Sequence, residues 1–273
     1  MDPELLSKIM KFQEKFEKYD LSICPQDENI ILTQFGVTLY TRVFSKIVPN
    51  FQRLTINKSI ENNNNTTITD IKYLKNPPEE CVTKYNRANL KRQSVLYGTF
   101  LLPTALNENN PDIGDLFTIS YWELKNENNP LLIYPVIDFF KTRNLQLKQV
   151  FIESIKDFPE NVKDEIIRDS CIIASYFKKY VEKGKEINYT FSAHIANKIF
   201  NEIYNGDVEA IIYPSVKDGT DADNIVIKPD AFNSKYKLAK VSENIVDTKK
   251  SGVIIFHELK TTNKFDKKIL MWN

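Results

Sequence analysis

The sequence predicts a mixed α+β domain. Short apolar runs rich in β-branched and aromatic residues, typical of strands, alternate with segments whose apolar residues recur at helical spacing. The strand-like runs are short and hairpin-like in places, which favours a mixed sheet core with flanking helices over a doubly wound parallel sheet. Neither an internal repeat nor a sharp boundary is visible, so residues 1–273 are expected to form a single domain.

The N-terminal part of the chain predicts a helix and then a strand. Residues 2–19 suit an amphipathic helix, because Asp2 can cap it, Pro3 suits its first position and apolar residues follow at helical spacing. Residues 36–44, GVTLYTRVF, are typical of a strand. The asparagine-rich stretch SIENNNNTTITD then predicts a loop that contributes nothing to the core.

The middle of the chain predicts three strands and a helical segment. The strands are expected at 94–100, 116–124 and 131–137, where apolar runs have strand length. PTALNE, directly after the first of these, suits a helical turn with Pro103 at its start. From about 143 to 183 the apolar residues follow a helical period and line one broad face.

The last third predicts one helix followed by strands. Ser192 precedes a run with helical apolar spacing, and Gly206 is expected to end that helix. Strands are expected at VEAIIYPSV, where Pro214 would end the ladder, and then at NIVIKP, KLAKVSENIV and SGVIIFHEL.

Composition and charge exclude several classes of protein. The 37 basic and 36 acidic residues leave a formal charge of +1, which gives no field for a polyanion, so nucleic acid is not expected as a direct partner. A membrane span is not expected, because no uninterrupted apolar run reaches about 18 residues. The charged N-terminus lacks the apolar region of a secretion signal, so we expect a cytoplasmic protein.

Cysteine and histidine content excludes further chemistry. The three scattered cysteines are expected to be ordinary reduced thiols, and no metal site is expected, because only His194 and His257 are available as further ligands. Glycine-rich phosphate loops are absent, and nothing near either histidine suggests a nucleophile elbow for a Ser-His-Asp triad.

Four segments, in order, resemble the RES-domain family: LYTRVF at 39–44, NRAN with QSVLYGTFLLPTALNE at 86–108, YTFSAHIANKIF at 189–200, and IIYPSVKDGTDADNIVIKP at 211–229. The family is named for an arginine, a glutamate and a serine that meet in one pocket. By this resemblance they fall on Arg42, Glu108 and Ser192. The matching core spans about 36–240, and the helix at 2–19 and the helical insertion at about 143–183 are typical of a longer subgroup.

The resemblance implies an ADP-ribosyltransferase-like fold that binds NAD as its substrate and breaks the nicotinamide–ribose bond. Characterised relatives are toxins of toxin–antitoxin pairs that deplete NAD by phosphorolysis or hydrolysis, so a protein antitoxin is a possible partner. Other relatives modify proteins by ADP-ribosylation. Two alternatives therefore stay open, namely mono-ADP-ribosyl transfer to a macromolecule and a catalytically silent module that binds NAD or a protein.

The chemistry of the individual residues agrees with NAD cleavage. A carboxylate such as that of Glu108 can stabilise the ribosyl cation-like state or orient the attacking group. A guanidinium, from Arg42 or Arg87, can hold the pyrophosphate through paired donors. Ser192, at the start of its helix, would offer a hydroxyl and unpaired backbone N–H groups to ribose or phosphate.

Three more residues complete the predicted pocket. Tyr97 can stack on the nicotinamide or adenine ring, Asn89 can supply amide hydrogen bonds, and Ser215 is a weaker candidate than Ser192. Each also has an ordinary structural role, such as helix capping for Ser192 and core packing for Tyr97. The chain departs from the family at Asn86-Arg87-Ala88-Asn89, where a glycine and an aromatic are usual, and at Pro103, where many members have an acidic residue.

Overall fold

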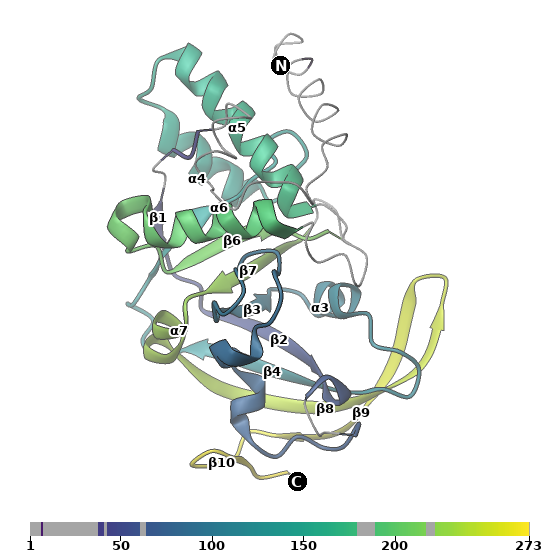
Figure 1. Cartoon of the computed structure of the whole chain (residues 1–273). Helices are drawn as coiled ribbons and strands as arrows, with labels where there is room; N and C mark the ends of the chain where they lie inside the picture. Colours follow the sequence, from purple (N-terminus) through teal and green to yellow (C-terminus); the bar gives the residue numbers. More distant parts are fainter. Residues whose placement is uncertain are drawn as a thin grey trace. The chain divides into compact units, whose positions relative to one another are not determined.

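A computed structural model describes Ser7 and residues 38–40, 43–60, 64–178, 189–216 and 222–272. These residues form two compact units (Figure 1). Unit 1 comprises Met1–Lys46, Pro78–Ser94 and Leu132–Val226, and unit 2 comprises Ile47–Pro77, Val95–Leu131 and Ile227–Asn273. Each unit draws on three chain segments, so no single cut in the sequence separates them, and the single-domain organisation stays a prediction. The helix predicted at 2–19 lies, apart from Ser7, outside the described residues.

The strands of unit 1 follow the spatial order β1 (Phe44–Lys46), β5 (Leu131–Pro135), β6 (Ala210–Pro214) and β7 (Asp223–Ile227). The central pair, β5 and β6, is parallel, with Ile133 opposite Ala210. All five residues of β6 are buried, which is typical of a strand covered on both faces. The strands predicted from VEAIIYPSV and NIVIKP are therefore confirmed, with Pro214 at the end of the first.

Unit 1 also contains the helices α4 (Leu145–Ile155), α5 (Glu160–Lys178) and α6 (Thr190–Asn201) (Figure 1). Asn144 caps α4, because its side-chain oxygen accepts a hydrogen bond of 2.9 Å from the Leu147 amide. The α5 helix buries one broad face and packs against both α6 and β6. The helical pattern predicted at about 143–183 is thus confirmed as two helices up to Lys178, and its remainder lies outside the described residues.

Unit 2 is built on an antiparallel sheet (Figure 1). Its strands follow the order β3 (Leu96–Thr99), β2 (Asn50–Ile56), β4 (Leu116–Leu124), β8 (Tyr236–Lys250) and β9 (Val253–Thr262). The register sets Phe51 opposite Trp122 and Leu54 opposite Ile119, so these two pairs lie on opposite faces of the sheet.

One short helix covers each face of the unit 2 sheet. On the face of Leu54, α3 (Leu102–Asn109) buries Ala105 and Leu106 in a cluster with residues of β4 and β8. On the face of Phe51, α7 (Pro229–Lys235) sets Phe232 against Trp122, with ring centroids 4.7 Å apart. Both helices carry proline in their first turn, as predicted for α3 from Pro103.

A buried carboxylate lies on the same face of unit 2 as Phe51. Glu243 is 1% exposed and forms an ion pair of 3.1 Å with Lys260. It also accepts hydrogen bonds from Thr67 Oγ1 at 3.0 Å and from Asn57 Nδ2 at 3.2 Å. The asparagine-rich segment therefore contributes to the interior, and Ile68 is buried as well. The expectation that this segment adds nothing to the core is wrong, because a buried carboxylate needs the donors that it supplies.

The first predicted strand begins later than expected. Thr38–Tyr40 are not in a strand, and β1 starts at Phe44. The Thr38 amide donates instead to Asp169 Oδ2 of α5 at 2.9 Å, and the Tyr40 hydroxyl donates to Glu165 Oε2 at 3.4 Å. These contacts use groups that a strand would turn toward a neighbouring strand or the core.

The remaining described elements are short. They are the 3-10 turns η2 (Asn57–Ser59), η3 (Ile71–Leu74), η4 (Glu79–Cys81) and η6 (Ile203–Gly206), and the strand pair β10 (Phe265–Asp266) and β11 (Ile269–Leu270). The α6 helix ends at Asn201, before the predicted end at Gly206, which closes η6 in a left-handed conformation with φ +82°. Among the described helices, none is both long and apolar enough to span a bilayer. The mixed α+β class is confirmed.

Candidate functional site

Two of the three residues predicted at the centre of the site are among the described residues, and these two belong to different units. Arg42 lies outside the described residues. Glu108 is in α3 of unit 2, and Ser192 is in α6 of unit 1. Their convergence in one pocket therefore stays a prediction, and the geometry of each unit is described by itself.

Ser192 lies inside the first turn of α6. The helix begins at Thr190, so Ser192 is its third residue and not its cap, which corrects the position predicted from the sequence. Its side chain is buried, and its hydroxyl donates to the Tyr189 carbonyl at 3.2 Å. This bond orients the hydroxyl hydrogen toward the chain, while the oxygen lone pairs keep the capacity to accept further hydrogen bonds.

Arg87 holds the C-terminal end of α5. Its Nη1 donates to the carbonyl of Phe177, in the last turn of that helix, where a cation is favoured by the helix dipole. Its Nη2 donates to the Tyr189 hydroxyl at 3.4 Å, and the guanidinium carbon lies 5.0 Å from the centre of the Tyr189 ring. Arg87 is therefore fixed between α5 and the residue that precedes α6.

Tyr189 connects two of the predicted site residues. Its hydroxyl and ring contact Arg87, and its carbonyl accepts from Ser192. Arg87 and Ser192 come from two separate segments of the sequence, so the structure brings these segments together in unit 1. Sequence reasoning missed Tyr189, although it opens the segment YTFSAHIANKIF and stands three residues before Ser192.

The segment around Arg87 runs along α6. Tyr85 lies beside His194 of that helix, with ring centroids 6.1 Å apart. Farther along, Gln93 Nε2 donates to Asn197 Oδ1 at 3.2 Å. With the Arg87–Tyr189 contact, these pairs follow the helix from its start toward its end, and they hold the Arg87 segment in a fixed register on α6.

Asn89 shapes the turn that presents Arg87. The backbones of Asn86 and Asn89 form an isolated bridge, with N···O distances of 3.1 and 3.4 Å. The Asn89 side chain is buried, and its Nδ2 donates to the Leu90 carbonyl at 2.8 Å. The side-chain amide of Asn89 was predicted to line the pocket, but one of its two N–H donors is used within the turn.

Ser215 follows the buried strand β6. It is fully buried, and its amide donates to the Ala222 carbonyl at 2.9 Å, which joins the end of β6 to the start of β7. Its place directly after Pro214 agrees with the predicted end of the strand. That Ser215 is a weaker candidate for ligand binding than Ser192 stays a prediction.

Tyr97 and Glu108 share one face of the unit 2 sheet. Thr99 of β3 is opposite Gln52 of β2, so Tyr97, two residues away, lies on the face that α3 covers. Glu108 is half-buried and lies one residue before the end of α3. A carboxylate there lies near the negative end of the helix dipole, which disfavours it relative to the first turn.

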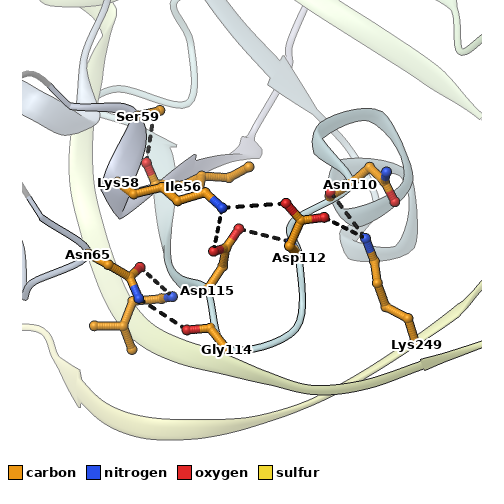
Figure 2. Close-up of polar contacts among 10 residues, drawn as sticks. Ile56, Lys58, Ser59, Asn65, Asn110, Asp112, Gly114, Asp115 and Lys249 are labelled. Atoms are coloured by element: carbon orange, nitrogen blue, oxygen red, sulfur yellow. Dashed lines mark hydrogen bonds and ion pairs between the residues drawn. The ribbon is translucent and has the colours of Figure 1, made fainter.

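The loop after α3 anchors the end of the helix that carries Glu108 (Figure 2). Asn110 ends α3 in a left-handed conformation, and its carbonyl accepts from Lys249 Nζ at 3.3 Å. Lys58 Nζ lies 3.4 Å from Asp112 and 2.7 Å from Asp115, and hydrogen bonding to Asp115 raises the pKa of Lys58. Because these contacts begin two residues after Glu108, they restrict the position of its backbone.

The cysteines and the acidic residues offer no metal site among the described residues, where no group of three or more histidine, cysteine, aspartate or glutamate side chains gathers. Burial raises the pKa of the Cys171 thiol to about 12, so this thiol is unreactive in the folded protein. Cys81 is exposed, and Cys24 lies outside the described residues.

No protein-family model matches this chain, and no curated protein matches it. The resemblance to the RES-domain family therefore depends on the order and spacing of the four segments.

Proposed function

We propose that this protein cleaves the nicotinamide–ribose bond of NAD, with phosphate or water as the acceptor. The bond between ribose C1 and the nicotinamide nitrogen breaks, and its electron pair leaves with neutral nicotinamide. A bond forms between the same carbon and an oxygen of the acceptor, which loses a proton when the acceptor is water or hydrogen phosphate. The products are nicotinamide and either ADP-ribose 1-phosphate or ADP-ribose.

The observation that carries the proposal is the contact of Arg87 and Ser192 with one residue, Tyr189. The two residues belong to separate segments of the RES-like pattern, and both are predicted members of the NAD pocket. A guanidinium and a serine hydroxyl in the first turn of a helix, both held by one tyrosine, suit the phosphates and ribose of a dinucleotide.

In the proposed mechanism Glu108 supplies the charge that the reaction needs. Departure of nicotinamide leaves positive charge on the ribose, and a nearby carboxylate stabilises that state more than it stabilises bound NAD. The anchored end of α3 supports this role, since it limits the reorganisation of the backbone that carries the carboxylate. Arg42, the third predicted residue, would share the binding of the pyrophosphate.

The test is NAD turnover by the purified protein, followed by nicotinamide release, with and without phosphate. Glu108→Gln is expected to lower the rate by about 100-fold or more, as the loss of one electrostatic group in a transition state does. Glu127→Gln, which changes an exposed glutamate of the same unit, is the matched control and should leave the rate unchanged. Intact NAD after prolonged incubation at high protein concentration would refute the proposal.

The position of a label on the ribose distinguishes the acceptors. Phosphorolysis leaves it on ADP-ribose 1-phosphate and hydrolysis on ADP-ribose, whereas transfer to a macromolecule leaves it on protein. The last result would replace the proposed reaction by mono-ADP-ribosyl transfer.

A further inference from the structure

Arg53 is a cation of unit 2 that the RES-like pattern does not include. It lies in β2, on the sheet face of Phe51, and is half-buried. Its Nη1 donates to the Tyr97 carbonyl of β3 at 3.1 Å. Its Nε is buried and has no hydrogen-bond partner among the described residues. The guanidinium is therefore held in place by one strand while a donor next to that contact is unused.

Thr55 adds a second unused donor on the same face. It lies two residues along β2 from Arg53, so their Cα atoms are roughly 6.5 Å apart and their side chains point to the same side. Its Oγ1 is also buried without a hydrogen-bond partner in the part of unit 2 that the structure describes. Leaving such a group unpaired costs about 1–3 kcal/mol, so two on one face favour an acceptor supplied from outside the chain.

The neighbouring polar groups do not neutralise Arg53. Ser120, opposite Arg53 on β4, donates to the Arg53 carbonyl at 3.3 Å. Thr118, opposite Thr55, donates to Asn57 Oδ1 at 2.9 Å. Glu243, the buried carboxylate of this face, is paired with Lys260 at 3.1 Å. No described carboxylate forms an ion pair with Arg53, and burial lowers its pKa to about 10.

We infer that Arg53 and Thr55 bind a phosphoryl group. The site has a fixed cation, a hydroxyl that can donate and no carboxylate paired with the cation, so it favours an anion with several oxygens. A planar guanidinium can offer Nε and Nη2 as a parallel pair to two oxygens of such a group. The half-buried side chain keeps part of its surface open for the approach of the anion.

Two sources can supply such a group, namely the pyrophosphate of a dinucleotide and free phosphate. The binding site depends only on Arg53 and Thr55, which lie on the sheet face opposite the one that α3 covers, so it does not depend on the proposed function. Calorimetric titration with inorganic phosphate and with inorganic pyrophosphate, at constant ionic strength, distinguishes the two sources. The anion that binds more tightly identifies the source.

The variants Arg53→Gln and Thr55→Val test the assignment. Arg53→Gln is expected to weaken binding of the preferred anion about 10- to 100-fold, and Thr55→Val about 3- to 10-fold, as the loss of a charged and a neutral donor predicts. Arg92→Gln, which removes an exposed arginine, should bind like the wild type. If the wild type binds neither anion, or if Arg92→Gln weakens binding as much as Arg53→Gln does, the inference is wrong.

If Arg53→Gln does not fold, the thermal unfolding of a second variant still tests the inference. Arg53→Met removes the buried charge and retains the bulk, so it should fold at least as well as the wild type in the absence of phosphate. Saturating phosphate should raise the melting temperature of the wild type by several degrees and leave that of Arg53→Met unchanged. An equal rise in both proteins would contradict the inference. Because neither assay contains NAD, phosphate binding without NAD cleavage would refute only the proposed function.

Discussion

The contact between Arg87 and Tyr189 can be measured as a coupling free energy in a double-mutant cycle. The single variants are Arg87→Met and Tyr189→Leu. Tyr189→Leu removes a ring whose centre lies 5.0 Å from the guanidinium and a hydroxyl that accepts at 3.4 Å, while the Arg87 bond to the Phe177 carbonyl remains. A partly exposed cation–π contact contributes about 0.5–1 kcal/mol, and a hydrogen bond of this length adds about 0.5 kcal/mol.

The cycle should therefore give a coupling free energy of about 1–1.5 kcal/mol between Arg87 and Tyr189. Urea unfolding of the wild type, both single variants and the double variant provides the four values. Ser192→Ala combined with Tyr189→Leu is the matched control, because Ser192 bonds to the backbone carbonyl of Tyr189, which Tyr189→Leu retains. Its coupling should stay below about 0.5 kcal/mol. Coupling near zero for Arg87 and Tyr189 would refute the proposed link between their segments.

Three other predictions concern buried groups. Glu243→Gln should destabilise the protein by about 1–3 kcal/mol, because it removes the buried carboxylate that pairs with the partly exposed Lys260, whereas Glu258→Gln in an exposed pair should cost less than about 1 kcal/mol in urea unfolding. Burial raises the pKa of Asp223, so its contribution to stability is largest below about pH 3.9 and is lost as the pH rises through the raised folded value. The stability of Asp223→Asn relative to the wild type should therefore increase between about pH 4 and pH 7, and a constant difference would contradict this. In a Cys24→Ser, Cys81→Ser variant, Cys171 should react with a thiol reagent only after unfolding, since burial raises its pKa to about 12, and a fast reaction in the native protein would show this to be wrong.

The strands that sequence reasoning found are those with one-sided or continuous apolar patterns. The β4 run, LFTISYWEL, was predicted with its observed bounds, and β6 stands out because all of its residues are apolar. The strand β2, NFQRLTI, which lies between β3 and β4, was missed. Its polar residues Gln52, Arg53 and Thr55 fall on both faces, so no alternation is visible, although two of the three are buried in the fold.

The site could be predicted only in part, because its residues contact one another across distant segments of the chain. The role of Tyr189 depends on Arg87, which is 102 positions away in the chain. Local capping signals also misplaced the start of α6 by three residues, since the cap is Tyr189 and Ser192 bonds back to its carbonyl from inside the first turn. Glu243 resembles an exposed strand residue in the sequence, and only the hairpin partner Lys260 and the loop residue Thr67 explain its burial.

We propose that Arg42, Glu108 and Ser192 serve one NAD site. The most direct measurement compares nicotinamide release by the variants Arg42→Gln, Glu108→Gln and Ser192→Ala with release by their pairwise combinations. Residues that act together in one site are strongly non-additive, so each single variant should lose about 100-fold or more and each double variant little beyond that. Activity that survives all three single substitutions, or losses that multiply in the double variants, would contradict the claim.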